Sequence, residues 1–516
     1  MPDVVDYVIV GAGSSGCVLA NRLSARVDVS VLVVEAGPAD RTAAVHIPAA
    51  LSRLFRSPLD WSYDTVPQPE LADRSIYWPR GKVLGGSSSL NAMMWVRGYA
   101  ADYDAWAQLA GAGWDYEHST RYFRRIDDAL HIEAQRSPRQ HTARFLEAVD
   151  QLGLLRAEVN SAQPDGFVQT LVNQHRGSRF SASDGYLKPV RQRRNLTVLT
   201  GAQATRVLFD RTGDRPRARG IEYTRNGIFH TVRAAREVIL AGGSVNSPQL
   251  LMLSGVGDGG ELREHGIEVV ADRAEVGKNL LDHLVSGLIV EVAGGSLLSA
   301  DQPRQIVDYL LRRRGMLTSN IAEAYGFVRS DSRLALPDLE LLFAPVAYVG
   351  QGLEKPPRHG ITLGVLLEQP KSRGTITLGS PDPVAAPVID PRYLSDPAGA
   401  DRRAMLAGLR LADRILHAPA FRGVVGGYIA PQGGASMPEE ERYVVALEQY
   451  AHTMYHPVGT CRMGADAASV VDPELRVRGV EGLRVADASV MPTIIRGHTH
   501  APSLVIGERA AELILA

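Results

Sequence analysis

The chain has 516 residues, of which 45% are hydrophobic and 22% charged, a composition typical of a globular protein with more than one structural unit. Its 56 Lys and Arg residues balance 57 Asp and Glu residues, which indicates neither nucleic acid nor an anionic membrane surface as a partner, because both favour a basic excess. Only two cysteines occur, the N-terminus lacks the features of a signal peptide, and no apolar run is long enough to span a bilayer. We therefore expect a cytoplasmic protein without a membrane span.

The N-terminal segments predict a β-strand, a helix and a second, parallel strand. Residues 6–11 form a short apolar run that leads directly into a glycine turn. Residues 14–26 then carry Leu19 and Leu23 at the i, i+4 spacing of a helix, and the β-branched run 29–35 ends at Glu35. Such a βαβ unit is typical of the start of a doubly wound α/β sheet.

The turn after the first strand has the spacing of a dinucleotide-binding fingerprint, Gly11-x-Gly13-x-x-Gly16. The glycines allow a tight turn and a close approach of phosphates, and the helix N-terminus favours a diphosphate. Glu35 lies where a carboxylate can bind the hydroxyl groups of an adenosine ribose. The alternatives are a glycine-rich surface turn and an exposed acid, but the strand–turn–helix context favours a nucleotide site.

Later segments predict further strands at residues 196–199, 206–209 and 238–241, and proline-punctuated strands at 339–343, 361–367 and 374–378. Near the C-terminus, residues 482–487 indicate a strand and residues 501–516 a helix. The chain is therefore expected to leave its first sheet, build a second one and return.

Four segments resemble the glucose–methanol–choline (GMC) oxidoreductase family. Residues 81–91 (GKVLGGSSSLN) resemble its first signature, and residues 243–257 (GSVNSPQLLMLSGVG) resemble its second. Residues 277–283 (GKNLLDH) and the stretch 482–507 are also similar to family segments, and all four follow the family's order. In style the chain is similar to bacterial choline-dehydrogenase-like members and to aryl-alcohol oxidases.

The resemblance implies the GMC fold, which is α/β in its first domain and α+β overall. We expect a Rossmann-like FAD-binding domain from residues 1–150, 190–285 and 441–516. A second, sheet-based substrate-binding domain is expected from residues 151–189 and 286–440, stacked over the flavin.

The same resemblance implies which residues contact FAD. At the nucleotide end they are Gly11, Gly13, Ser15, Gly16, Glu35 and Ala36. Nearer the flavin they are Trp61, Gly86, Asn91, Ala92, Met93, Met94, Ala204, Tyr455, Asp487, Ala488, His500 and Ala501. Plain core packing is the alternative role for the two methionines. Leu90 stands where some family members link FAD through a histidine, so we expect FAD to be bound non-covalently.

His456 and His498 are the candidate catalytic residues. His456 lies in residues 455–464 (YHPVGTCRMG) and His498 in residues 496–502 (RGHTHAP), which resemble the family segments that carry the active-site pair. Alcohol oxidation removes a hydroxyl proton and transfers a hydride to flavin N5, so it needs a neutral imidazole as base and a second group that orients the alcohol. No Cys/His cluster with zinc spacing occurs, and no metal is expected.

The substrate is expected to be a primary alcohol, either benzylic or allylic, with O2 as the acceptor that yields H2O2. Tyr325, Phe327, Phe343 and Tyr348 are candidates for an apolar pocket, although aromatic residues at strand spacing are more often core. Glu323 can either serve a trimethylammonium group or be structural. The alternatives are a choline or aliphatic alcohol dehydrogenase with another electron acceptor, a hydroxynitrile-lyase-type activity, and a non-catalytic FAD-binding protein.

Overall fold

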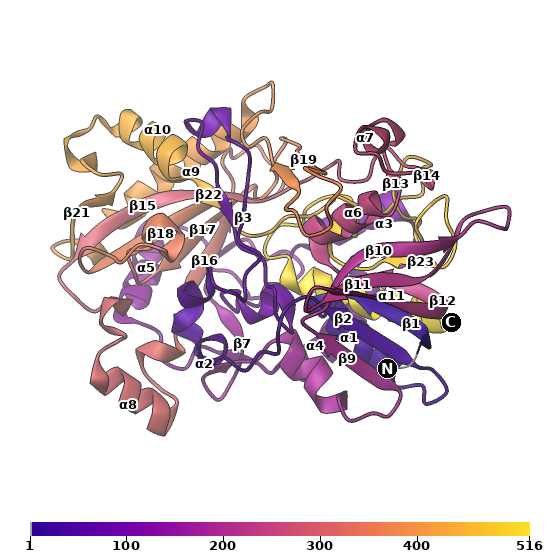
Figure 1. Cartoon of the computed structure of the whole chain (residues 1–516). Coiled ribbons are helices and arrows are strands. Elements are labelled where there is room, and N and C mark those ends of the chain that lie inside the picture. Colours follow the sequence, from indigo (N-terminus) through magenta and orange to yellow (C-terminus); the bar gives the residue numbers. More distant parts are fainter. Residues whose placement is uncertain (1–2) are drawn as a thin grey trace.

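The computed structural model describes residues 3–516. Met1 and Pro2, with which the segment predicted to lack a signal peptide begins, lie outside the described residues. Two large β-sheets lie at opposite ends of the molecule, with helices around them and loops between them (Figure 1). Within the described part of the chain, no helix is long and apolar enough to cross a membrane.

The first sheet contains the predicted parallel strands and confirms the expected fold class. Its strand order is β10-β11-β12-β1-β2-β9, and β23 pairs with the C-terminal end of β12, on the edge opposite β1. The parallel strands are β1 (Val4–Val10), β2 (Val31–Glu35), β9 (Leu196–Thr200), β12 (Ile228–Leu240) and β23 (Leu483–Val485). Strands β10 (Gln203–Asp210) and β11 (Arg217–Arg225) add an antiparallel edge.

Helices α1 (Ser14–Leu23) and α11 (His500–Leu515) pack side by side against this sheet. A Cβ atom on Gly507 would lie 3.1 Å from the Cα of Ser15, so the close approach of the two helices requires a glycine there. Arg22 of α1 forms an ion pair of 2.7 Å with Glu508 of α11, whose side chain is buried. These contacts hold the C-terminal helix next to the glycine turn that precedes α1.

The second sheet is antiparallel and has the order β16-β17-β18-β15-β21, with β22 beside β15. Its strands are β15 (Leu284–Val292), β16 (Ala324–Val328), β17 (Leu339–Ala344), β18 (Gly360–Leu367), β21 (Val425–Ala430) and β22 (His452–Thr453). The strands predicted at 339–343 and 361–367 are confirmed as β17 and β18, whereas the one predicted at 374–378 is β19 (Thr375–Thr377), which pairs with β20 (Val388–Asp390).

The two faces of the second sheet have different neighbours. Helix α9 (Ala400–Leu416) packs so closely on one face that a Cβ atom on Gly408 would lie 2.3 Å from Val365 Cγ1. Since side chains alternate along a strand, Thr362 and Gly364 point to the other face, which lines a cavity. Helix α10 (Glu439–Tyr450) and β22 lie with this sheet, and the division into two domains at the predicted boundaries stays a prediction.

The remaining elements connect and cover the two sheets. The helices are α2 (Ala43–His46), α3 (Ala100–Ala110), α4 (Tyr116–Leu130), α5 (Gln140–Gln151), α6 (Gly243–Leu253), α7 (Gly259–Glu264) and α8 (Pro303–Arg312). The short strands are β3 (Tyr63–Asp64), β4 (Tyr77–Trp78), β5 (Ile132–Ala134), β6 (Gly166–Gln169), β7 (Leu171–His175), β8 (Ser178–Arg179), β13 (Val256–Gly257) and β14 (Ala271–Asp272).

Candidate active site

A cavity of about 870 Å³ extends from the glycine turn of the first sheet to the open face of the second sheet. All but two of the site residues expected from the sequence line it, and the two exceptions are Gly16 and Ala501. Gly16 lies inside α1, where a Cβ atom would come within 2.0 Å of the carbonyl oxygen of Gly11. Gly16 therefore allows the helix to pack on the turn, which is the role that the fingerprint gives to its last glycine.

The nucleotide end of the cavity is built around Glu35. Its carboxylate oxygens accept hydrogen bonds from the backbone N–H groups of Ala12 and Gly37, each at 2.8 Å. Burial raises the pKa of Glu35, although both hydrogen bonds act to lower it. Each oxygen keeps a lone pair for a further donor, so the side chain can bind hydroxyl groups while it holds the glycine turn in place.

Gly86 brings a second loop against the glycine turn. Its φ is +56°, and a Cβ atom there would lie 2.7 Å from the Cα of Gly13. The positive φ and the lack of space for a Cβ atom both exclude a residue larger than glycine. No side chains separate the turn from the loop. Backbone atoms therefore form the cavity wall at this point, where a bound diphosphate could approach them closely.

Asp487 lines the cavity, but four protein donors already occupy its carboxylate. These are the N–H of Gly243, the Oγ of Ser247, and the N–H and Oγ of Ser489, at 2.6–2.8 Å. The side chain holds the start of α6 and the turn that follows β23. We therefore expect it to position neighbouring backbone, such as that of Ala488, more than to bind hydroxyl groups itself.

His500 offers an unpartnered atom at the middle of the cavity. Its Nδ1 contacts Ser14 Oγ at 3.1 Å, whereas Nε2 is buried without a hydrogen-bond partner among residues 3–516. Burial, followed by the positive charge of Arg179, lowers its pKa to about 4, so the ring is neutral. A buried polar atom without a partner is costly, and a bound group that satisfies Nε2 would remove that cost.

Asn91, Met93 and Met94 follow one another closely along the cavity wall. Asn91 Oδ1 accepts hydrogen bonds from Met93 N–H at 3.0 Å and from Arg179 Nη1 at 2.7 Å. Met93 has a φ of +55°, and both methionines are buried and line the cavity. Met94 also packs into a small apolar cluster with Val96, so core packing and cavity lining occur together. No sequence motif marks Arg179, a buried guanidinium whose pKa burial lowers to about 9.

The two predicted catalytic histidines lie next to each other in the cavity wall. The rings of His456 and His498 have centroids 4.8 Å apart and are nearly perpendicular. Both rings line the cavity and are largely buried. His498 Nε2 lies 3.2 Å from Glu340 Oε1, and His456 Nδ1 lies 2.9 Å from His283 Nδ1. Each ring therefore uses one nitrogen for the protein and keeps the other for the cavity.

The third histidine, His283, determines which nitrogen of His456 is free to accept a proton. His283 Nε2 contacts the carbonyl oxygen of Glu368 at 3.2 Å, and a carbonyl can only accept a hydrogen bond, so Nε2 carries a proton. Burial lowers the pKa of His283 to about 3, which keeps the ring neutral and leaves Nδ1 as an acceptor. His456 Nδ1 must then be the donor, and the lone pair of His456 lies on Nε2.

The pKa of His456 is lowered well below the ordinary value, first by burial and then by the neighbouring imidazole of His498. Glu340 and Glu368 are fully buried behind the rings, and Glu368 accepts a hydrogen bond from the N–H of Gly497. Burial, and then the charge of Glu340, raises the pKa of Glu368 well above the usual range. His456 is therefore neutral near pH 7, and its lone pair is available to accept a proton.

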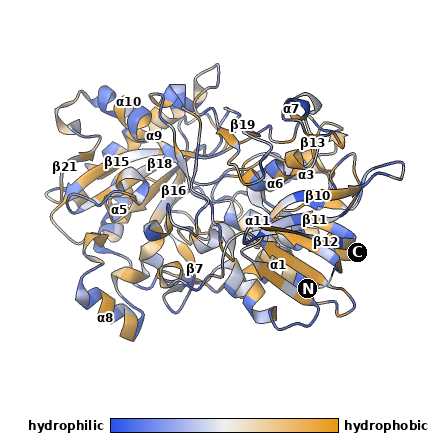
Figure 2. Cartoon of the chain, in the orientation of Figure 1, coloured by the Kyte–Doolittle hydropathy of each residue, from blue (hydrophilic) through white to orange (hydrophobic). Residues whose placement is uncertain are grey.

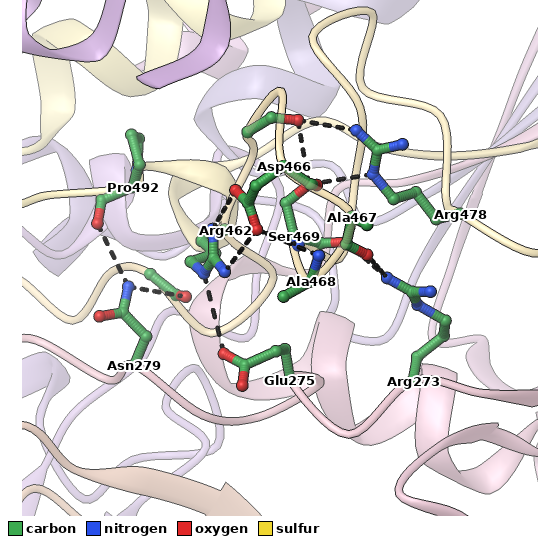
Figure 3. A network of polar contacts seen from close by, with 12 residues as sticks. Arg273, Glu275, Asn279, Arg462, Asp466, Ala467, Ala468, Ser469, Arg478 and Pro492 are labelled. Atoms are coloured by element: carbon green, nitrogen blue, oxygen red, sulfur yellow. Dashed lines mark hydrogen bonds and ion pairs between the residues drawn. The ribbon is translucent and has the colours of Figure 1, made fainter. Parts of the chain in front are cut away.

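Polar contacts join segments that precede or follow the three histidines in the chain (Figure 3). Asn279 Nδ2 donates to the carbonyl oxygen of Pro492 at 3.2 Å and reaches that of Gly459 at 3.5 Å. Arg462 pairs with Asp466 at 2.8 Å, and its Nε lies 3.8 Å from Glu275. Figure 3 also shows that Arg273 and Arg478 reach the loop around Ser469 from separate segments. These contacts therefore connect the segments around residues 273–279, 459–478 and 492 to one another.

The second sheet supplies a smooth wall beyond the histidines. Leu342, Gly364 and Gly287 are direct neighbours across β17, β18 and β15 and line the cavity. The next row outward is Ala344, Thr362 and Ile289, and the row on the inner side contains Glu340. At about 3.4 Å per strand residue, the outer row lies roughly 14 Å from the Glu340 row. Small and aliphatic residues thus form an apolar trough that leads away from His498.

Aromatic residues also line the cavity near this trough. Tyr455 lies 5.8 Å from Phe55 between ring centroids, and its hydroxyl is 3.3 Å from that of Tyr348. Of the aromatic pocket candidates, only Tyr348 lines the cavity, while Tyr325, Phe327 and Phe343 lie in the core. Sequence reasoning missed Phe55, because nothing in its local pattern distinguishes it from a core residue.

Glu323 is structural. Its carboxylate is buried and accepts hydrogen bonds from Ser319 Oγ, Thr142 Oγ1 and the N–H of Arg139, each at 2.6 Å. It does not line the cavity. The contacts of Glu323 therefore support its structural role and not a role as partner for a trimethylammonium group.

Comparison with known proteins agrees with this geometry. Two family models described as GMC oxidoreductase match residues 5–285 and 370–507. An "Uncharacterized GMC-type oxidoreductase" of Mycobacterium tuberculosis is 56% identical over 99% of both chains. "Alcohol dehydrogenase [acceptor]" of Pseudomonas putida is 41% identical over 99% of this chain and 95% of the relative. "Oxygen-dependent choline dehydrogenase" of Brucella suis biovar 1 is 38% identical with the same coverage.

Solved structures give the same result. The crystal structure of pyridoxine 4-oxidase from "Mesorbium loti" matches with a TM-score of 0.88 and 30% identity over 98% of both chains. A fungal aryl-alcohol oxidase matches with a TM-score of 0.83 and 25% identity over 100% of this chain and 99% of that one.

Proposed function

The chain belongs to the GMC oxidoreductase family, and on that premise we propose that it binds FAD non-covalently and oxidises primary alcohols to aldehydes. We further propose that the alcohol carries an aromatic, benzylic or allylic group and that O2 is the electron acceptor, which gives H2O2. The observation that carries this proposal is the hydrogen-bond chain from Glu368 through His283 to His456, because it leaves a lone pair on His456 Nε2 beside His498.

The cavity residues fit FAD along its whole length. Glu35 and the Gly11–Gly13 turn suit the adenosine and diphosphate, and Asn91, Met93 and His500 suit the ring system. When bound, FAD supplies the two-electron acceptor that the side chains themselves lack. The protein's part is to bind, orient and exclude water, and to move one proton.

Non-covalent binding is expected because Leu90 cannot form a bond to the cofactor. Leu90 is buried in an apolar cluster with Val45, Leu54 and Val83. Acid precipitation of the purified holoenzyme should therefore release FAD into the supernatant, measured by its visible absorbance. A yellow pellet under a colourless supernatant would contradict this expectation.

The proton step is assigned to His456. Its Nε2 accepts the proton of the substrate hydroxyl, because Nδ1 is engaged as a donor to His283. His498 is close enough to contact the same oxygen, and Glu340 holds the His498 ring from behind. Two fixed rings thereby orient the carbon that bears the hydroxyl group.

The shape and charge of the trough support a neutral, apolar alcohol over choline. The acidic residues that line the cavity are Glu35, Asp64, Glu354 and Asp487. Glu35 and Asp487 belong to the first-sheet end, Asp64 forms an ion pair with Arg56, and Glu354 lies beside Gly350. The wall formed by Leu342, Gly364 and Ile289 is uncharged. An aromatic or unsaturated group would be buried there with little desolvation cost, whereas a cation would lose its hydration.

The name of the Brucella relative keeps choline as the second candidate, and the same assay distinguishes the two. The holoenzyme is mixed anaerobically with benzyl alcohol, cinnamyl alcohol, choline or mandelonitrile, and flavin bleaching is followed. The proposal expects bleaching by the first two, then fast reoxidation with H2O2 release when air is admitted. Bleaching by choline alone would overturn the substrate assignment. Cleavage of mandelonitrile without any flavin bleaching would indicate a lyase.

If air reoxidised the flavin slowly and an artificial acceptor reoxidised it rapidly, the choice of O2 as acceptor would be overturned.

A cytoplasmic location remains part of the proposal. It is supported by Cys17 and Cys461, which are both free and buried, as expected for a protein that matures without disulfides.

A further inference from the structure

Helix α8 (Pro303–Arg312) presents its apolar side chains away from the protein. The inner side is held by Tyr309, which is 2% exposed and whose hydroxyl contacts Ser178 Oγ at 3.1 Å. The outer stripe occupies helix positions i, i+1, i+4 and i+5, and its exposed fractions are 42, 51, 63 and 78% for Ile306, Val307, Leu310 and Leu311. A surface helix normally has the reverse arrangement, with its apolar stripe against the core.

Arginines surround this apolar stripe. Four of them are exposed on or just after the helix: Arg304, Arg312, Arg313 and Arg314. Two more come from the turn between β7 and β8, which contains Arg176, and from the segment after β5, which contains Arg136. A Cβ atom on Gly177 of that turn would lie 2.7 Å from the carbonyl oxygen of Arg313 and 3.2 Å from Arg136 Cδ. Arg136 and Arg176 are both exposed.

The charge of this patch is strongly unbalanced, although the whole chain has a net charge of only −1. The acidic residues of the same segment are Asp301 and Asp308, and Asp308 already lies 3.4 Å from Arg312. Glu133, on β5 beside β7, is a further acid nearby. The neutral composition therefore conceals a local basic and apolar surface. Figure 1 shows that α8, the helix that carries it, protrudes from the molecule near the second sheet.

We propose that α8 docks the protein reversibly on an anionic lipid surface. Figure 2 shows hydrophobic (orange) and hydrophilic (blue) residues side by side on α8. This pattern is expected for a helix that lies in the plane of a membrane interface. The four aliphatic side chains would enter the boundary between headgroups and acyl chains. The surrounding guanidinium groups would pair with lipid phosphates, for which their planar donors are well suited.

A second copy of this chain fits the surface less well. In a twofold contact between two α8 helices, the same patch faces itself, so Arg312 and Arg313 of each copy would approach those of the other. Such like charges oppose association, whereas anionic lipid neutralises them. The charges of the patch therefore favour lipid as the occupant.

Co-sedimentation with vesicles tests the proposal on the holoenzyme. Vesicles of phosphatidylcholine alone are compared with vesicles that contain an equimolar amount of phosphatidylglycerol. We expect binding only to the anionic vesicles and its loss at high salt, because the attraction acts within a Debye length. The triple variant Arg312→Gln, Arg313→Gln, Arg314→Gln should weaken binding roughly 100-fold, at about one power of ten or less per arginine.

The apolar part is tested by Leu310→Gln with Leu311→Gln, which should also abolish sedimentation. The matched control is Ile228→Gln with Phe229→Gln, an exposed apolar pair at the far end of the first sheet, which should bind as the wild type does. None of these residues lines the cavity, so alcohol oxidation should be unchanged in every variant. Lipid binding is measured without turnover, so the two proposals fail independently.

Three outcomes would overturn the proposal. The first is no binding of the wild type to anionic vesicles, or equal binding to both kinds. The second is undiminished binding of both α8 variants. The third is a dimer in sedimentation velocity that the Leu310→Gln, Leu311→Gln variant converts to a monomer, which would assign the stripe to a second copy.

Discussion

The chemistry of the site depends on one hydrogen bond between two histidines. His283 is buried and neutral, and its Nε2 is committed to a carbonyl oxygen, so its Nδ1 can only accept from His456. The tautomer of the proposed base is therefore determined by a residue that does not line the cavity. This arrangement turns an ordinary imidazole into one whose lone pair faces the substrate.

Replacement of His283 tests this dependence with a matched pair of variants. His283→Leu removes the acceptor and should slow anaerobic flavin reduction by about tenfold, the worth of one hydrogen bond in a buried network. His283→Gln can still accept from His456 and donate to Glu368, and should keep most of the rate. Stopped-flow absorbance measures both. Equal rates in the two variants would show that His283 only fills space.

The pH dependence of reduction follows from the lowered pKa of His456. The neutral ring is the proton acceptor, and burial, followed by the neighbouring imidazole of His498, holds its pKa well below 6.5. The active form is therefore fully present near pH 7 and is lost only as the pH falls through that lowered value. Stopped-flow reduction from about pH 8 to about pH 6 should give a constant rate. A decline centred at or above 6.5 would contradict the environment described for His456.

At the scale of elements, the site depends on which face of β18 each residue occupies. Val365 packs under α9, while Gly364 faces the cavity between Leu342 and Gly287. A Cβ atom on Gly364 would meet Val285 Cγ2 at 3.4 Å, an ordinary contact, so a side chain fits there and points into the trough. A Cβ atom on Gly287 would lie 2.6 Å from the carbonyl oxygen of Leu363 and does not fit.

Gly364→Val should therefore fold normally and exclude bulky alcohols. We expect kcat/KM for the best aromatic alcohol to fall by about tenfold or more, the usual effect of a few methylene groups in a pocket, while small alcohols are little affected. Gly364→Ala should give an intermediate loss, and Gly287→Ala should instead lower the melting temperature. An unchanged preference in Gly364→Val would show that the substrate does not follow this wall.

The elements that sequence could predict are those whose local pattern matches their environment. β1, α1 and β2 are buried or amphipathic along their whole length, and their boundaries lie within three residues of the prediction. β12 was predicted only at 238–241, whereas it begins at Ile228. Its first half is largely exposed and so lacks an apolar run, and pairing with β11 holds it in place.

At the scale of the whole molecule, the site brings together segments that are far apart in the chain. His283 and His456 are separated by 173 residues, and His498 and Glu340 by 158. Motifs identified the histidines at 456 and 498, because each lies in a distinctive short segment. The motif at 277–283 includes His283 but does not reveal its role, and no motif marks Glu340, Glu368 or Arg179. The roles of these residues come from contacts that only the folded chain creates.

The central claim is that this cavity holds FAD with His456 as the base of alcohol oxidation. The most direct test is anaerobic reduction of the His456→Ala holoenzyme by its best alcohol, followed by flavin absorbance. The account predicts a normal flavin spectrum and a reduction rate lowered by roughly 10²–10⁴, the usual contribution of a general base. Reduction at the wild-type rate with FAD fully bound would contradict it.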